Sequence, residues 1–361
     1  MTICTECGFE NPENHKFCQS CGADLPTISE LESKLEIEEI SSSSTATVES
    51  DPAISIENSE PVILSESTNK LENLDEKPPQ EEDVTDPDLS TPIFTKLRYA
   101  GLSDVGKERN HNEDGFRCFS QFMITESHSQ PEFQTHRGLF ILCDGMGGHA
   151  GGEVASAMAI EAIAENFKPF WTSGLPSQAK IREIIEIANQ AIYNLNESEL
   201  RKNAGRMGTT LVMVVVDGTE VAIAHVGDSR IYKISEDGVT QLTRDHEVAI
   251  KLIDEGMDAA IAYERYDAHQ LTQALGPNSS QSLEPAIAFF SLESPALFLL
   301  CSDGLSDNDV VEQNWQQLSP LLVADSDLKT GVKNLVQLGN DLNGYDNISA
   351  VLVHCQIDVS S

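Results

Sequence analysis

The chain has 361 residues, and its 59 aspartates and glutamates outnumber its 23 lysines and arginines enough to give a formal net charge of −36. Such an acidic surface repels nucleic acid and anionic membranes, so we expect neither as a partner. No apolar run approaches the roughly 18 residues that a membrane-spanning helix needs. The first ten residues have neither the basic flank nor the apolar stretch of a secretory signal. We therefore expect a cytoplasmic protein.

Four of the eight cysteines fall within the first 21 residues, where Cys4 and Cys7 form one Cys-x-x-Cys pair and Cys18 and Cys21 form another. Two such pairs supply the four sulfur ligands of a tetrahedral zinc site. A redox-active pair would lie in a strand–helix pattern, which this segment lacks. Residues 1–25 resemble the zinc-ribbon family. We expect one structural zinc ion there, with no open coordination position for catalysis.

An acidic stretch follows the cysteine pairs. Residues 24–92 contain 19 acidic residues against three lysines, no aromatic residue and no glycine. This composition cannot bury enough apolar area to offset the conformational entropy of folding, which predicts a disordered, self-repelling linker over residues 26–93. Ile28, Leu31 and Leu35 could line one face of a short partner-binding helix, but an isolated helix of that length is marginal. We prefer the linker.

The composition becomes that of a globular domain from residue 94 onward. The β-rich runs 209–216 and 219–226 are joined by Asp217-Gly218, which is a strong hairpin signal. Helical spacing of apolar residues predicts helices over 152–167, 181–195, 247–256 and 326–338. Consecutive hairpins combined with long helices predict a layered domain of sheets and helices, which we place at residues 94–357.

Acidic residues recur where the predicted strands of this domain end. The motifs lie at residues 109–114, 144–149, 225–230, 301–307 and 344–348. One Asp-Gly turn after a strand is more often structural than functional. Several such turns in one domain favour a functional role, because carboxylates brought together cannot all ionise unless cations neutralise them. Ligand sets made of oxygen alone favour hard cations, which here indicates Mg²⁺ or Mn²⁺.

The motifs follow the order found in the metal-dependent protein phosphatases, the type 2C serine/threonine phosphatases. They read Arg-x-x-Asn-Glu-Asp, Asp-Gly-Met-Gly-Gly-His, Gly-Thr-Thr, Gly-Asp-Ser-Arg, Leu-Thr-Gln-Ala-Leu-Gly, Ser-Asp-Gly-Leu and Asp-Asn-Ile. Over residues 99–355 the chain resembles the bacterial branch of this family. The resemblance implies an α+β fold, a four-layer α/β/β/α sandwich of two antiparallel sheets flanked by helices. It also implies hydrolysis of phosphoserine and phosphothreonine in proteins by a metal-bridging water.

Matching positions implies roles at a first pair of metal sites. Asp144 would bridge two Mn²⁺ or Mg²⁺ ions, and Gly145 would lend its backbone carbonyl to the same centre. Asp303 and Asp346 would complete the coordination of the first ion. The attacking water would lie between the two ions, so no covalent phospho-enzyme is expected.

The remaining implied roles surround that pair. Glu113 and Asp114 would hold the second ion, directly or through water. Asp228 and Asp307 match the acids that hold a third, weaker metal in the bacterial branch. Arg109 matches the position of the residue that binds the substrate phosphate in the family it resembles. An arginine suits that role, because its guanidinium fork binds two phosphoryl oxygens at once.

Two departures from the family pattern concern the substrate side of the site. Many eukaryotic members have a histidine after the Asp-Gly, where this chain has Met146. The acid that protonates the leaving group is therefore unassigned, and metal-bound water is our default. Residues 247–269 correspond to the variable flap of the family, and their 257–266 part departs from the usual bacterial pattern, which leaves the substrate preference open.

Two alternatives belong to other functional classes. A catalytically weak, phosphatase-like binding module would lack metal-binding acids, yet Asp144, Asp303 and Asp346 are all present. A zinc-ribbon scaffold that binds nucleic acid would need a basic ribbon, but residues 1–23 contain one lysine against three glutamates. We therefore prefer a monomeric protein phosphatase whose zinc ribbon docks on an unidentified partner.

Overall fold

The structure is a computed structural model that describes residues 2–3, 10–11, 92–127, 130–147, 151–170, 174–202 and 205–359. In the N-terminal part, β1 (Thr2–Ile3) and β2 (Glu10–Asn11) pair in antiparallel fashion. Outside the described residues lie the predicted linker up to residue 91 and the four predicted zinc ligands, Cys4, Cys7, Cys18 and Cys21.

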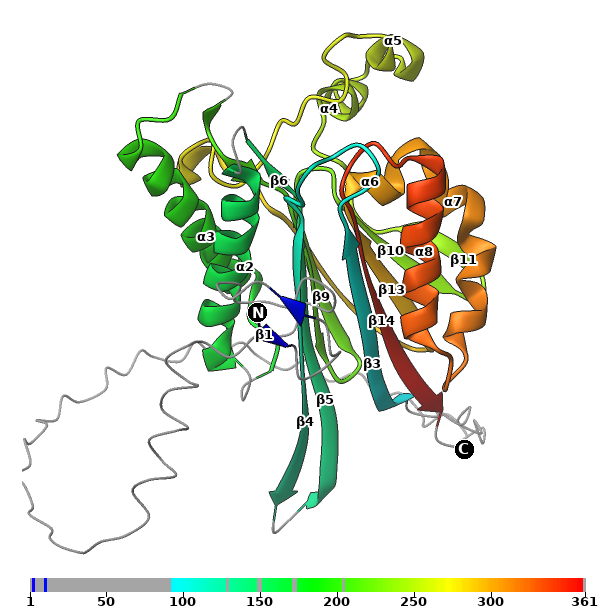
Figure 1. Ribbon diagram of the computed structural model, residues 1–361. Coiled ribbons are helices and arrows are strands. Elements are labelled where there is room, and N and C mark those ends of the chain that lie inside the picture. The colour runs from blue at the N-terminus through cyan, green and yellow to red at the C-terminus, as the bar shows by residue number, and fades with distance from the viewer. Residues whose placement is uncertain are drawn as a thin grey trace, which may run out of the picture. The chain divides into compact units, whose positions relative to one another are not determined.

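Two antiparallel five-stranded sheets form the centre of the part that begins at residue 92 (Figure 1). The first has the order β11 (Gly238–Gln241), β10 (Arg230–Ser235), β13 (Ala296–Cys301), β14 (Ile348–Val359), β3 (Pro92–Asp104). The second has the order β12 (Ala286–Ser291), β9 (Glu220–Val226), β8 (Leu211–Asp217), β5 (Gln130–Cys143), β4 (Gly115–Ser127). A further short pair consists of β6 (Gly145–Met146) and β7 (Gly208–Thr209).

Most helices of the described part lie against the outer faces of the two sheets (Figure 1). The α-helices are α2 (Gly151–Phe167), α3 (Gln178–Ser198), α4 (Val248–Asp254), α5 (Ala259–Tyr263), α6 (Asp303–Ser306), α7 (Val310–Asn314) and α8 (Leu328–Leu342). The 3₁₀ turns are η1 (Lys168–Phe170), η3 (Ser280–Ser282), η4 (Asp307–Asp309), η5 (Trp315–Gln317) and η6 (Ser319–Leu322). The predicted helices correspond to α2, α3, α4 and α8. The prediction for α4 ran two residues too far, because Gly256 takes φ +100° just after that helix.

β8 and β9 form the hairpin that the sequence predicts. Their register pairs Leu211 with Val226 and Asp217 with Glu220. Gly218 takes φ +58° in the turn between the strands, a conformation that glycine adopts without a steric penalty.

Three apolar cores separate the layers. Phe140, Val214, Phe298 and Val353 belong to the core between the two sheets. Met213, the neighbour of Val214 on β8, faces the opposite core beneath α2 and α3, as strand alternation requires. The third core lies between the first sheet and α6, α7 and α8. These layers confirm the predicted α/β/β/α sandwich (Figure 1). No helix in the described part of the chain is both long and apolar enough to cross a membrane.

Candidate active site

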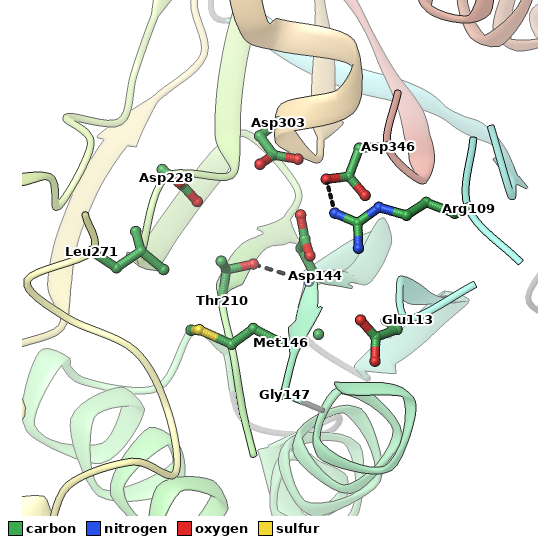
Figure 2. A pocket seen from close by; sticks show the side chains of 11 residues that line it. Arg109, Glu113, Asp144, Met146, Gly147, Thr210, Asp228, Leu271, Asp303 and Asp346 are labelled. Atoms are coloured by element: carbon green, nitrogen blue, oxygen red, sulfur yellow. Dashed lines mark hydrogen bonds and ion pairs between the residues drawn. The ribbon is translucent and has the colours of Figure 1, made fainter. Parts of the chain in front are cut away.

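The acidic motifs meet at one end of the two sheets, around a cavity of about 440 Å³. The cavity is lined by Arg109, Glu113, Asp144, Gly145, Met146, Gly147, Thr210, Asp228, Leu271, Asp303 and Asp346. Figure 2 shows the acidic side chains arranged around Asp144. Of the residues from this domain to which the resemblance assigns a role, all but Asp114 and Asp307 line the cavity. Thr210 and Leu271 also line the cavity, although no sequence pattern assigned either of them a role.

Two threonines fix the backbone of Asp144, which lies between β5 and β6. The Asp144 N–H donates to Thr210 Oγ1 (2.9 Å), and the Asp144 carbonyl accepts from Thr209 Oγ1 and from the Thr210 N–H (both 2.8 Å). The Thr210 hydroxyl also lies 2.7 Å from Ser229 Oγ. The Gly-Thr-Thr motif therefore sets the position from which the Asp144 side chain enters the cavity (Figure 2).

Close packing requires a glycine at position 145. A Cβ atom there would lie 2.1 Å from the carbonyl oxygen of Gly152 and 2.5 Å from that of Glu113. The Gly145 N–H donates to the Glu113 carbonyl (3.1 Å), and the Glu113 carboxylate accepts from the Gly152 N–H at the start of α2 (3.3 Å). The tight approach of these segments brings Glu113 to the cavity wall.

Asn347 holds the loop that carries Arg109 and Glu113. Its Nδ2 donates to the carbonyls of Val105 (2.9 Å) and His111 (3.0 Å), and its Oδ1 accepts from the Glu113 N–H (2.8 Å). The Asn347 side chain is buried at the start of β14. In the Asp-Asn motif, therefore, the aspartate faces the cavity and the asparagine orders the loop opposite.

Arg109 reaches the cavity from this loop and pairs with Asp346. The Arg109 Nη2 to Asp346 Oδ2 distance is 2.5 Å, and the arginine side chain is 48% exposed. Burial by itself would lower the pKa of Arg109, but the nearby carboxylates of Asp346, Glu113 and Asp144 raise it overall. The guanidinium is therefore charged and open to solvent on one side, as a phosphate-binding group must be.

Burial and mutual repulsion raise the pKa of three carboxyl groups in the cavity, those of Asp144, Asp228 and Asp303. For Asp144 and Asp303, burial is the largest cause and neighbouring carboxylates add to it, so both pKa values lie well above 3.8. Burial, followed by the charge of Glu247, raises the pKa of Asp228 to about 7. Full ionisation of this group of acids therefore requires compensating positive charge.

The donor atoms fit a hard divalent cation. The Oδ1 atoms of Asp303 and Asp114 are buried without a hydrogen-bond partner, which is costly for a carboxylate unless a cation compensates it. The acidic side chains around the cavity offer oxygen alone, the donor that Mg²⁺ and Mn²⁺ prefer. In the described part of the chain, no three acidic, histidine or cysteine side chains are grouped tightly enough to hold an ion by themselves. Backbone carbonyls and water would therefore have to complete any coordination shell.

The two predicted ligands that do not line the cavity are engaged by neighbouring hydroxyl groups. Asp114 Oδ2 accepts from Ser302 Oγ (2.8 Å), and burial raises the pKa of Asp114 to about 6. Asp307 Oδ2 accepts from the Tyr345 hydroxyl (2.6 Å). Their roles as metal ligands stay predictions.

Met146 and Leu271 form an apolar part of the wall. No histidine belongs to the lining of the cavity as far as its residues are described. The structure therefore provides no histidine in the described lining to protonate a leaving group, and our default of metal-bound water stays a prediction.

Comparisons with known proteins agree with this architecture. Residues 128–330 match the family model of protein phosphatase 2C, and residues 3–25 match that of a zinc-ribbon domain. The chain is 32% identical over 259 residues to serine/threonine protein phosphatase PstP of Mycobacterium tuberculosis, an alignment that covers 71% of this chain and 44% of PstP. It thus spans less than half of that relative. It is also 30% identical over 260 residues to protein phosphatase PhpP of Streptococcus pneumoniae, covering 70% of this chain and 95% of PhpP.

A solved structure extends the similarity to three dimensions. The catalytic domain of serine/threonine protein phosphatase PstP, in complex with two manganese ions, superposes with a TM-score of 0.54 at 30% identity. The superposition covers 74% of this chain and all of that domain, 100% of its length. Sequence motifs, sheet architecture and these matches lead to one assignment: the chain belongs to the protein phosphatase 2C family.

Proposed function

We propose that this protein is a metal-dependent serine/threonine protein phosphatase that hydrolyses phosphoserine and phosphothreonine in other proteins. One observation carries the proposal: a partly exposed arginine and five acids from separate strand ends line one cavity. The relatives PstP and PhpP are named as protein phosphatases, which supports the same activity here.

The residues of the cavity fit Mn²⁺ or Mg²⁺. One part of the metal centre would be held by Asp144, Asp303, Asp346 and the Gly145 carbonyl. Glu113 would lie on the opposite side of the centre. The manganese ions in the PstP structure support two ions at this place. Such ions supply Lewis acidity toward water and phosphoryl oxygens and neutralise the charge of the phosphate.

The chain itself contributes positioning and charge. Arg109 binds two phosphoryl oxygens through its guanidinium fork while Asp346 orients it, so the phosphate enters with a fixed direction. Asp144 cannot move away, because the threonine contacts hold its backbone. The Thr210 hydroxyl is already engaged with Asp144 and Ser229, which makes it a poor nucleophile. The residues therefore support direct hydrolysis without a phospho-enzyme.

We extend the proposal to the finer features of the chain. A third, weaker ion would lie at Asp228, close enough to Asp307 for the charge of Asp307 to raise the pKa of Asp228. One structural zinc ion would be held by the four N-terminal cysteines, which the match of residues 3–25 to a zinc-ribbon domain supports. We infer a cytoplasmic monomer whose zinc ribbon docks on a partner protein, while the acidic linker tethers the ribbon to the phosphatase domain.

Three peptides that differ only in carrying phosphoserine, phosphothreonine or phosphotyrosine test the proposal. After removal of metal and addition of Mn²⁺, we expect phosphate release from the first two and little from the third. Mn²⁺ binding without hydrolysis of any peptide would instead favour the catalytically weak binding module.

A further inference from the structure

Arg230 connects three segments that meet at the cavity. It is the first residue of β10, two residues after Asp228, and its side chain is only 18% exposed. Its Nε donates to Asp245 Oδ2 (2.9 Å), and its Nη2 lies 2.8 Å from the same oxygen. Its Nη1 donates to the carbonyl of Ser306 (3.1 Å), the last residue of α6. One guanidinium therefore joins the strand after Asp228, the segment around Asp245 and the end of α6.

Neighbouring groups fix the orientation of this guanidinium. Its Nη1 also donates to the hydroxyl of Tyr232 (3.1 Å), a fully buried side chain that in turn donates to Glu312 Oε1 on α7 (2.7 Å). Gln241 Nε2 donates to the second carboxylate oxygen of Asp245 (2.9 Å). Tyr232 holds the Arg230 side chain and Gln241 holds Asp245. The guanidinium therefore keeps one orientation and fixes its three segments relative to one another.

The contact to α6 links the two segments that carry Asp228 and Asp303 on the cavity wall. α6 begins at Asp303, so a bond from Arg230 to Ser306 ties that helix to the strand that follows Asp228. Asp228 and Asp303 both line the cavity, and their like charges repel each other when ionised. Arg230 holds their segments together against that repulsion.

The contact to Asp245 reaches the base of the flap (residues 247–269). The Thr272 N–H donates to the His246 carbonyl (2.7 Å), which ties the two ends of the flap together. Leu271, directly after the flap, lines the cavity. Figure 1 shows α4 and α5, the helices of the flap, standing away from the two sheets. The position of the flap base therefore depends on Asp245 and its partner.

We propose that Arg230 is a positioning residue that couples the flap to the Asp228 side of the metal centre. It keeps Asp228 and Asp303 together for a divalent cation and fixes the flap base relative to both. This inference rests on the proposed function. Lysine cannot replace the arginine, because one ammonium group lacks the rigid fork that reaches Asp245 and the Ser306 carbonyl at the same time.

Two measurements on the full, zinc-loaded chain test the proposal without using phosphatase activity. Calorimetric titration with Mn²⁺ should show at least one binding step weakened about tenfold in Arg230→Lys, the lower end of the effect of losing residues that support a metal site. Limited trypsin digestion should cleave the flap faster in this variant, after Lys251 and Arg265. Asp245→Asn, which keeps the side-chain shape, should reproduce both changes and decides the question if Arg230→Lys does not fold.

Arg137→Lys is the matched control. Arg137 Nε lies 2.6 Å from Asp217 Oδ1, and the two side chains are 13% and 17% exposed, so the pair is about as buried as that of Arg230. This control should leave Mn²⁺ binding and flap cleavage unchanged at a comparable loss in melting temperature. The proposal is overturned if Arg230→Lys and Asp245→Asn both match the unmodified chain. It is also overturned if the control gives the same losses, or if the unmodified chain binds no Mn²⁺. A chain that binds Mn²⁺ but hydrolyses no phosphopeptide would refute the proposed function instead, and these two readouts would still decide the role of Arg230.

Discussion

Replacement of Asn347 by alanine should release the loop that carries Arg109 and Glu113. The buried amide bonds the carbonyls of Val105 and His111 and the N–H of Glu113. Each such bond contributes about 1 kcal/mol net, and a buried polar group left without a partner adds a desolvation penalty. We therefore expect Asn347→Ala to lower the free energy of unfolding by about 2–4 kcal/mol. Because Arg109 loses its fixed position, kcat/KM for a phosphopeptide should fall about 100-fold.

Urea unfolding followed by tryptophan fluorescence measures the first effect, and initial rates at saturating Mn²⁺ measure the second. Asn166→Ala is the control, because the Asn166 side chain donates only within its own helix, to the carbonyl of Ala162. We expect the control to change the free energy of unfolding by no more than about 0.5 kcal/mol. An Asn347→Ala variant as stable and as active as the control would refute the role given to this amide.

The other predictions concern the phosphate clamp, the charge of the cavity and the zinc ribbon. Arg109→Ala should raise KM more than it weakens Mn²⁺ binding, with partial rescue by lysine; unchanged steady-state kinetics would contradict the clamp. Without metal, the raised pKa of Asp228, about 7, means that the folded chain holds a proton that the unfolded chain releases above about 3.8. The stability from Asp228 should therefore be lost as pH rises from about 4 to about 7. Over that range the urea midpoint of Asp228→Asn should fall less steeply than that of the unmodified chain. Cys18→Ser should abolish zinc binding without changing the melting temperature of the phosphatase domain or kcat/KM for a small phosphate ester. A several-fold change in kcat/KM would indicate a ribbon that controls access to the cavity.

Local patterns in the sequence were enough to predict the β8–β9 hairpin and the longer helices. β8 and β9 are continuous runs rich in valine around an Asp-Gly turn, and α2 and α3 show clear helical spacing. α5 was missed, because five residues are too few for periodicity to register. Its start does carry a local signal, since the Asp258 side chain accepts from the Ala260 and Ile261 N–H groups as a helix cap.

The cavity was predictable in part, because acids next to strand ends gather wherever those ends meet. The contacts that hold the acids were not predictable, since their partners are remote in sequence: Asn347 bonds Val105 across 242 positions. Asp307 shows that a place in an acidic motif does not by itself predict where the side chain points. It lies four residues after Asp303, yet α6 ends at Ser306, and the carboxylate turns to the Tyr345 hydroxyl instead of lining the cavity.

The most direct test of the central claim is phosphate release from a phosphothreonine peptide by the full chain, before and after Mn²⁺ is restored to the chelated protein. The account predicts no release in excess chelator and full recovery with Mn²⁺. It predicts almost no release at any Mn²⁺ concentration from Asp144→Asn, because that carboxylate lies at the centre of the cavity (Figure 2). Undiminished release after confirmed metal removal, or an Asp144→Asn variant as active as the unmodified chain, would contradict it.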